Sequence, residues 1–133
     1  MMHRYTESAE YIKQMIGDRQ PEVLMILGSG LGFMADEVEN AAVIPYEDIP
    51  NFKVSTVDGH AGKLVVGDLE GVCVMVMHGR VHCYEGYAPQ EVSYPVRVAK
   101  LLGVQSLLVT NAAGAVNESY SVGDLILISV HIR

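Results

Sequence analysis

The chain has 133 residues, of which 50% are apolar and 19% are charged, and its formal net charge at pH 7 is -7. This composition excludes a disordered tail or a coiled coil and predicts a globular protein consisting of one domain or part of one. The acidic balance argues against a nucleic-acid-binding surface, because contact with a phosphate backbone requires a surplus of Lys and Arg.

The N-terminal stretch has no apolar segment of the kind found in secretory signals, and no apolar run approaches the roughly 20 residues that span a bilayer. We therefore expect a cytoplasmic protein with no membrane contact. Cys73 and Cys83 lack the spacing of a zinc or redox motif, and Cys73 lies in an apolar run. A small buried thiol in a reducing compartment is the expected role of Cys73.

The first third of the chain predicts a helix, a strand and a second, short helix. Glu7–Ile16 places apolar side chains three and four positions apart, with Thr6 as the N-cap and Gly17 as the C-terminal stop. Val23–Leu27 is apolar at every position, as in a strand that is buried on both faces of a sheet. Leu31–Val38 then predicts the short helix.

The middle of the chain predicts three strands. Two prolines within Ala41–Phe52 deny hydrogen bonds to a neighbouring strand, which favours an edge strand followed by a loop. Lys63–Leu69 and Val72–Met77 are rich in β-forming residues and flank the dipeptide Glu70-Gly71, a pattern typical of a β-hairpin.

The last third predicts a helix over Gln90–Leu102, with Pro89 at its first position, an interruption near Pro95 and Gly103 at its end. Ser106–Thr110 predicts a third buried strand, and a further apolar run lies near the end of the sequence.

These elements predict an α/β fold, with a mixed, largely parallel sheet flanked by helices. Such a sheet needs helices on both faces, yet only two substantial helices accompany about five strands. We therefore expect residues 1–133 to be roughly half of a larger α/β domain, or a single domain that borrows cover from a partner.

Three of the predicted strands run into polar or glycine-rich loops. These are GSGLG at residues 28–32, HGRVHCYEGY at residues 78–87 and NAAGA at residues 111–115. Ligands of open α/β sheets bind outside the carboxyl ends of the strands, so parallel strands would bring all three loops to one edge.

The first loop is suited to an anion. Gly28 and Gly30 allow positive φ or close approach of the backbone, and Ser29 adds a hydroxyl beside N–H groups that can bind an anion. A tight turn selected for packing explains the glycines equally well. Phe33 replaces the third glycine of a dinucleotide fingerprint, and no lysine follows Gly32 as it would in a P-loop, so both motifs are disfavoured.

The second loop offers charged and aromatic side chains. Arg80 carries a planar fork of donors suited to phosphate, and His82 points the same way if the segment is extended. With Ser29 they would form an oxyanion clamp; a surface arginine and a histidine satisfied by backbone are the alternative. Tyr84 either covers a sugar or packs, and Glu85 either orients a neighbour or is simply solvated.

The third loop has small side chains over Asn111–Gly114, so its backbone N–H groups can approach a ligand, unless the residues serve close packing of a helix on the strand. His60 lies in VDGHAG and either closes over the site or is an ordinary loop histidine. His60, His78 and His82 are too scattered to predict a metal site. The residues alone support an anion or phosphate-ester site and no named reaction.

The segments LGSGLG, GHAG, HGRVHCYEGY and TNAAGA, followed by VGDLILI, resemble in order and spacing the N-terminal half of a trimeric-class purine nucleoside phosphorylase. The resemblance extends from Val23 to near the end of the chain. It implies phosphorolysis, in which inorganic phosphate attacks the anomeric carbon of a purine nucleoside and releases the base and pentose 1-phosphate. It also implies no metal or organic cofactor, a place in purine salvage, and a homotrimer in the full-length protein.

The resemblance also implies roles for individual residues. Tyr84 would contact the ribose, and three side chains would serve catalysis: His82, His60 and Glu85. Phosphate would be held by side chains of the loops and by one backbone N–H group, namely Ser29, Arg80, His82, His60 and the N–H of Ala112. The supporting backbone would be that of Gly28, Gly30, Asn111 and Ala113.

Two other functions stay open. One is an enzyme of the methylthioadenosine phosphorylase type, although the NAAGA and YEGY segments look more like the purine nucleoside enzyme. The other is a truncated, non-catalytic module that binds phosphate or assists assembly. In the family the groups that stabilise the departing purine belong to the C-terminal half. The resemblance therefore implies that this chain supplies the phosphate site and part of the ribose site, lacks full activity alone, and leaves 6-oxo against 6-amino preference undecided.

Overall fold

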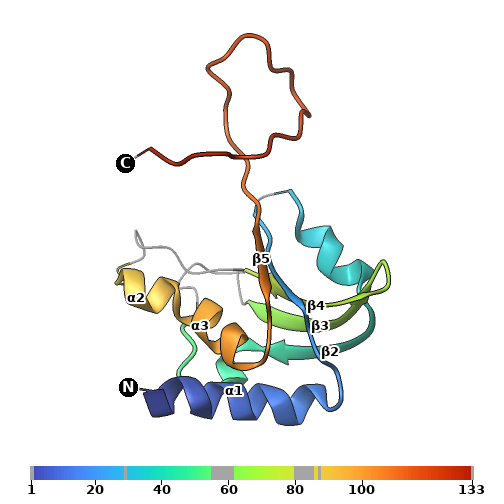
Figure 1. The fold of residues 1–133 in the computed structure, drawn as a ribbon, viewed down its shortest axis with the longest axis vertical. Helices are drawn as coiled ribbons and strands as arrows, with labels where there is room; N and C mark the ends of the chain where they lie inside the picture. Colours follow the sequence, from blue (N-terminus) through green and yellow to red (C-terminus); the bar gives the residue numbers. More distant parts are fainter. Residues whose placement is uncertain (1, 29, 55–61, 80–85, 87, 133) are drawn as a thin grey trace.

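The computed structural model describes all residues except 1, 29, 55–61, 80–85, 87 and 133. The described residues form one five-stranded sheet in the order β2-β3-β4-β1-β5, with α1 and α3 packed beside it (Figure 1). In chain order the elements are α1 (Met2–Ile16), β1 (Val23–Ile26), η1 (Gly32–Glu37), β2 (Glu39–Pro45), η2 (Tyr46–Asp48), β3 (Lys63–Leu69), β4 (Val72–His78), α2 (Pro89–Val92), α3 (Tyr94–Leu101) and β5 (Ser106–Val109), where η denotes a 3-10 helix.

The sheet is mixed, as the sequence predicts. β1 lies between β4 and β5 and is parallel to both, whereas β2, β3 and β4 are antiparallel neighbours. The predicted hairpin between β3 and β4 is confirmed, because Glu70 has φ 51° and Gly71 has φ 80°, the positive pair that a tight hairpin turn favours. The parallel half of the sheet is therefore the half that ends in the three loops.

The two faces of the sheet are covered by different elements. Alternate strand residues such as Leu24, Leu64 and Met75 face α1 and α3 in one core cluster. The intervening residues, such as Met25 and Val76, belong to a second cluster that includes Ala35 of η1. The prediction of a first strand buried on both faces is thus confirmed, and it explains why β1 carries no polar residue.

Helix α1 begins earlier than predicted. Thr6 lies inside it, where its hydroxyl donates to the carbonyl of Met2 at 3.1 Å, so the prediction of Thr6 as the N-cap is wrong. Serine and threonine hydroxyls readily bond back to the preceding helical turn, which a sequence pattern does not distinguish from capping. Gly17 does end the helix, with φ 64° and an N–H that donates to the carbonyl of Lys13 at 3.1 Å.

A buried polar contact joins α1 to α3. The Tyr94 hydroxyl donates to the Arg4 carbonyl at 2.7 Å and lies 2.8 Å from the hydroxyl of Ser8, which is fully buried. The rings of Tyr5 and Tyr94 stack with their centroids 4.6 Å apart. These contacts fix the crossing of the two helices by hydrogen bonds as well as by apolar packing.

The predicted helix over residues 90–102 is two helices. α2 ends at Val92 and Ser93 separates it from α3, so the interruption predicted near Pro95 is confirmed. Pro95 lies in the first turn of α3, where its missing N–H leaves no hydrogen bond unmade. Gly103 follows α3 with φ 91°, as the predicted C-terminal stop requires.

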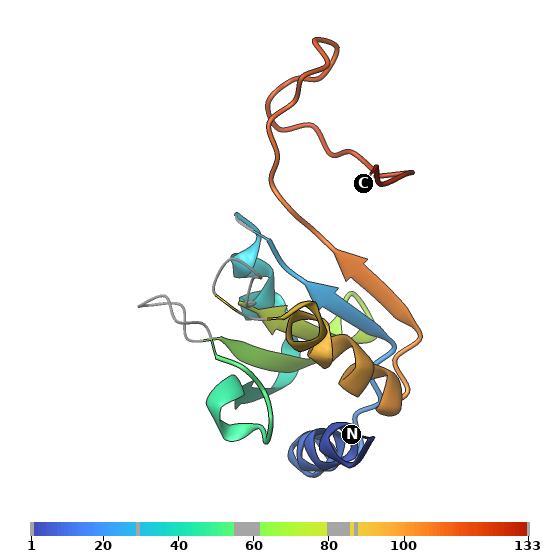
Figure 2. The same cartoon turned by 90° about the vertical axis from the view of Figure 1, so that its left-hand side faces the viewer.

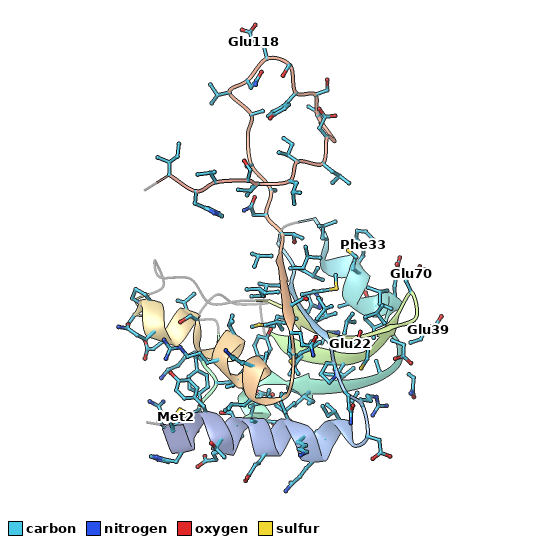
Figure 3. All side chains as sticks on the ribbon, viewed as in Figure 1. Met2, Glu22, Phe33, Glu39, Glu70 and Glu118 are labelled. Carbon is cyan, nitrogen blue, oxygen red and sulfur yellow. The ribbon has the colours of Figure 1, made fainter. Side chains whose placement is uncertain are left out.

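β5 differs from its prediction as a buried strand. Leu107, Leu108 and Val109 are 49%, 47% and 49% exposed, because β5 is the outermost strand and no described residue pairs with its outer side. After it, residues 110–132 form no helix or strand and lead away from the sheet (Figure 2), with Glu118 far from the body (Figure 3). No described helix has the length and apolarity needed to cross a membrane.

We predict that Ile12→Ala lowers the free energy of unfolding by about 2–5 kcal/mol, because it removes a side chain that is fully buried between α1 and the sheet. Met15→Ala is the matched control on the same helix, since Met15 is 47% exposed, and its effect should stay within about 0.5 kcal/mol. Urea unfolding followed by circular dichroism measures both. Equal effects of the two substitutions would contradict the placement of α1.

Candidate functional site

The carboxyl ends of β1, β4 and β5 lie at one edge of the sheet. Ile26 pairs with both Met77 and Val109 in the parallel registers, so the three loops that follow begin side by side. The expectation that parallel strands bring these loops together is confirmed. We call this boundary, from Pro45 of β2 to Val109 of β5, the loop edge.

The fourth segment of the sequence pattern reaches the same edge from the other half of the sheet. Lys63, the first residue of β3, pairs with Pro45 on one side and with His78 on the other. The GHAG segment ends at Gly62, one residue before Lys63. All four segments therefore enter or leave the sheet at the loop edge.

Gly28 joins the first loop to the third. Its N–H donates to the Thr110 hydroxyl at 2.9 Å, and that hydroxyl donates to the Ile26 carbonyl at 3.3 Å. A Cβ at Gly28 would lie 2.5 Å from the Thr110 carbonyl oxygen and 2.8 Å from the Asn111 Cα. Glycine is thus required here by close approach of two backbones, which is the packing interpretation of this residue.

The first loop also packs against the end of β4. A Cβ at Gly32 would lie 2.9 Å from Nε2 of His78, so the imidazole rests against the backbone where η1 begins. Gly30 differs from both neighbours: its φ is 88° and a Cβ there would meet nothing within 4 Å, so the turn itself requires glycine. The first loop is consequently held between the ends of β4 and β5.

Tyr46 connects the other two segments. Its hydroxyl donates to the Gly79 carbonyl at 2.6 Å, and its backbone N–H donates to the Gly62 carbonyl at 3.1 Å. Burial raises the pKa of Tyr46 far above its ordinary value, so the phenol remains a neutral donor. Tyr46 is not among the residues that the sequence predicts to be functional, because a tyrosine after an edge strand gives no sign of which backbone it will contact.

Most of the side chains predicted to bind ligands lie outside the described residues: Ser29, His60, Arg80, His82, Tyr84 and Glu85. Of the remaining candidates, Gly28 and Asn111 are brought into contact by the structure. Ala112 and Ala113 follow directly and are exposed, so their backbone is open to a ligand or to another part of a larger protein. Their predicted roles stay predictions.

The hollows among the described residues are small near the loop edge. A cavity of about 100 Å³ beside it is lined largely by apolar side chains, including Ile26, Tyr46, Met77 and Val96. Ligand pockets usually measure about 300–1,000 Å³, so this cavity alone does not hold a nucleoside. A hollow of about 310 Å³ lies between α1, α2 and α3, and none of its described lining residues belongs to the four segments.

Neither metal nor thiol chemistry is supported by the described side chains. No three His, Cys, Asp or Glu residues among them converge on a point where a metal would bind. Burial and the nearby Asp68 carboxylate raise the pKa of the Cys73 thiol, which lowers its thiolate fraction at neutral pH and makes it a poor nucleophile. Cys73 packs against the core, as expected of a small apolar residue, while Cys83 lies outside the described residues.

The sequence profile of the phosphorylase superfamily matches residues 22–133, which include the whole sheet. The chain belongs to the phosphorylase superfamily. Its matched region begins one residue before β1, so within this superfamily the loop edge is part of the shared domain and α1 precedes it.

Members of the phosphorylase superfamily with high similarity include purine nucleoside phosphorylase 1 of Geobacillus stearothermophilus, 59% identical over 127 residues that cover 96% of this chain and 46% of that protein. Purine nucleoside phosphorylase 1 of Bacillus subtilis (strain 168) is 55% identical over 133 residues, which cover 100% of this chain and 49% of that protein. The chain spans about half the length of the curated relatives it matches.

A solved structure confirms the fold. The crystal structure of isoform 2 of purine nucleoside phosphorylase from Schistosoma mansoni, in complex with cytosine and ribose-1-phosphate, superposes with a TM-score of 0.85 at 47% identity. The match covers 92% of this chain and 42% of that one. The mixed sheet with its flanking helices is therefore the corresponding part of a phosphorylase domain.

We predict that Gly28→Ala lowers the free energy of unfolding by about 1–3 kcal/mol, because the added methyl group meets the Thr110 and Asn111 backbones and neither can move as a side chain can. Gly114→Ala is the control, since a Cβ there would meet nothing within 4 Å, and it should change stability by less than about 0.5 kcal/mol. Urea unfolding compares the two. A tolerated Gly28→Ala would mean that β1 and β5 are not in the register described.

Proposed function

We propose that this chain provides the phosphate site and part of the ribose site of a purine nucleoside phosphorylase. The observation that carries the proposal is the convergence of four segments on the loop edge. The sheet registers bring together there the ends of the stretches that contain Ser29, His60, Arg80 and Ala112. The two bacterial relatives that share more than half of this chain's residues over the matched region are named purine nucleoside phosphorylase 1, which supports the same activity.

In the proposed reaction an oxygen of inorganic phosphate attacks the anomeric carbon of the nucleoside. The bond from that carbon to the purine nitrogen breaks, its electron pair leaves with the base, and the base takes up a proton. The products are the free purine and pentose 1-phosphate. Since positive charge develops on the sugar as the bond breaks, a phosphate dianion held against it stabilises the transition state and is already aimed at the carbon.

The roles of the residues are part of this proposal. Ser29, Arg80 and His82 bind phosphate together with the backbone N–H of Ala112, and Tyr84 contacts the ribose. His60 lies over the phosphate and Glu85 beside it, and both assist catalysis with His82. The arginine is suited to the task because its fork of donors matches two phosphate oxygens at once.

The proposal extends to the whole enzyme. It acts in the cytoplasm as a homotrimer, uses purine nucleosides and phosphate as substrates, and needs no metal or organic cofactor. The part of the base pocket that stabilises the departing purine belongs, in this proposal, to the other half of the enzyme, and among the described residues the hollow beside the loop edge is only about 100 Å³. The alternatives are a methylthioadenosine phosphorylase and a non-catalytic phosphate-binding module.

We expect the 133-residue chain alone to show no more than residual phosphorolysis of inosine, and its fusion to the remaining half of the Geobacillus stearothermophilus relative to restore turnover. Release of hypoxanthine in phosphate buffer measures both. Full-rate activity of the chain alone would contradict the assignment of the base site to another half. A fusion that cleaves methylthioadenosine in preference to inosine would favour the first alternative.

Arg80→Ala should weaken binding of inorganic phosphate at least about tenfold, because a hydrogen bond to a charged group contributes about 1.5–3 kcal/mol. Titration calorimetry on the chain measures the affinity. Arg19→Ala is the matched control: it removes the same charge from the opposite edge of the sheet, where Arg19 donates to the Asn40 carbonyl at 3.0 Å. Phosphate binding that persists in Arg80→Ala would show that Arg80 does not belong to the phosphate site. Phosphate binding without turnover by the fusion described above would favour the non-catalytic module.

A further inference from the structure

Tyr46 is the first residue after β2, and it makes separate contacts with the backbone at the start of β3 and at the end of β4. Its N–H donates to Gly62, which precedes β3, and its hydroxyl donates to Gly79, which follows β4. The three strands are already paired to one another, so these contacts do not decide the order of the sheet. They hold the backbone at Gly62 and Gly79, where the chain enters and leaves the sheet at the loop edge.

Each of the two residues that Tyr46 contacts is a glycine for a structural reason. The Tyr46 ring lies where a side chain at Gly62 would be, so only glycine fits beneath it. Gly79 has φ 103°, a region that L side chains rarely adopt, and its carbonyl accepts the Tyr46 hydrogen bond at 2.6 Å. That carbonyl belongs to the peptide bond that leads to Arg80. The phenol therefore holds the last described residue before the Arg80 segment.

The surroundings make Tyr46 a rigid support. The side chain is 3% exposed, and its ring packs against Phe52 with the centroids 5.8 Å apart. Ionisation of the phenol is suppressed by burial, so the hydrogen bond to Gly79 persists over the pH range in which phosphate binds. An amphipathic side chain with two rotatable bonds loses little entropy when held in this way.

We propose that Tyr46 is a positioning residue for phosphate binding: through Gly79 and Gly62 it holds the ends of the segments that carry Arg80 and His60. The inference rests on the proposed function, in which these two residues meet the phosphate. Tyr46 itself does not touch the ligand in this account. It holds the backbone next to the side chains that bind phosphate. Small displacements of that backbone reduce the affinity for phosphate.

A second tyrosine provides a matched comparison within the same core. Tyr94 is 7% exposed, also packs against Phe52 with ring centroids 5.9 Å apart, and donates to the Arg4 carbonyl at 2.7 Å. Tyr46→Phe and Tyr94→Phe thus each remove a phenol hydroxyl that donates to a backbone carbonyl, and the Tyr94 hydroxyl also contacts Ser8. Only the first of these bonds holds a residue of the loop edge.

The test is titration calorimetry of the 133-residue chain with inorganic phosphate, well below the thermal unfolding temperature of each variant. Both substitutions should lower that temperature, because each removes a phenol hydroxyl that donates to a backbone carbonyl. Tyr46→Phe alone should weaken phosphate binding, by about three- to tenfold, the range that one ordinary hydrogen bond represents. A role confined to stability would leave the affinity of the folded chain unchanged.

Three results would overturn the inference. One is unaltered phosphate affinity in Tyr46→Phe, and another is equal weakening in Tyr94→Phe. The third is absence of phosphate binding by the unsubstituted chain, which would overturn the proposed phosphate site as well. The first two results would overturn only the positioning role of Tyr46. Should Tyr46→Phe not fold, NMR of the unsubstituted chain decides: phosphate should shift the ring signals of Tyr46 and leave those of Tyr94 in place, and unshifted Tyr46 signals contradict the proposal.

Discussion

The parallel pairing of β1 with both β4 and β5 is the constraint on which the candidate site depends. It places three carboxyl strand ends in one row, and Gly28 lies so close to the Thr110 and Asn111 backbones that no side chain fits between the first and third loops. The remaining segment, GHAG, is brought to the same row by the hairpin of β3 with β4. A phosphate site assembled from distant segments needs such a scaffold, because its donors must be fixed before the ligand arrives.

Much of the fold was predictable because its signals are local. The apolar run of β1, the Glu70-Gly71 turn and the stop at Gly17 each follow from a few neighbouring residues, and the structure has all three. Two predictions failed, and the one for Thr6 was local, because a hydroxyl that bonds back to Met2 looks like a cap in the sequence. The other depended on a partner distant in sequence. The burial predicted for Ser106–Thr110 required a neighbour on the outer side of β5, which the described residues do not provide, and a pattern of apolar residues carries no information about that neighbour.

The candidate site was predictable to a different degree. That three loops share an edge followed from one assumption, parallel strands, and the registers confirm it. For Arg80, His82 and Ser29 the residue types left an oxyanion clamp as one of two interpretations and a resemblance favoured it, and the described residues do not test it. Tyr46 was missed altogether, because its importance lies in two backbone carbonyls, at Gly62 and Gly79, that only the folded chain brings within reach of it. Supporting residues of this kind leave little trace in a sequence.

The hairpin turn at Glu70-Gly71 divides the sheet into regions under different demands. β3 and β4 each have seven residues, so at about 3.3 Å per residue the turn lies roughly 20 Å from the loop edge. Nothing that binds at one end of the hairpin is in contact with the other. A fluorophore or an affinity tag attached at this exposed turn therefore has access to solvent without reaching the loop edge.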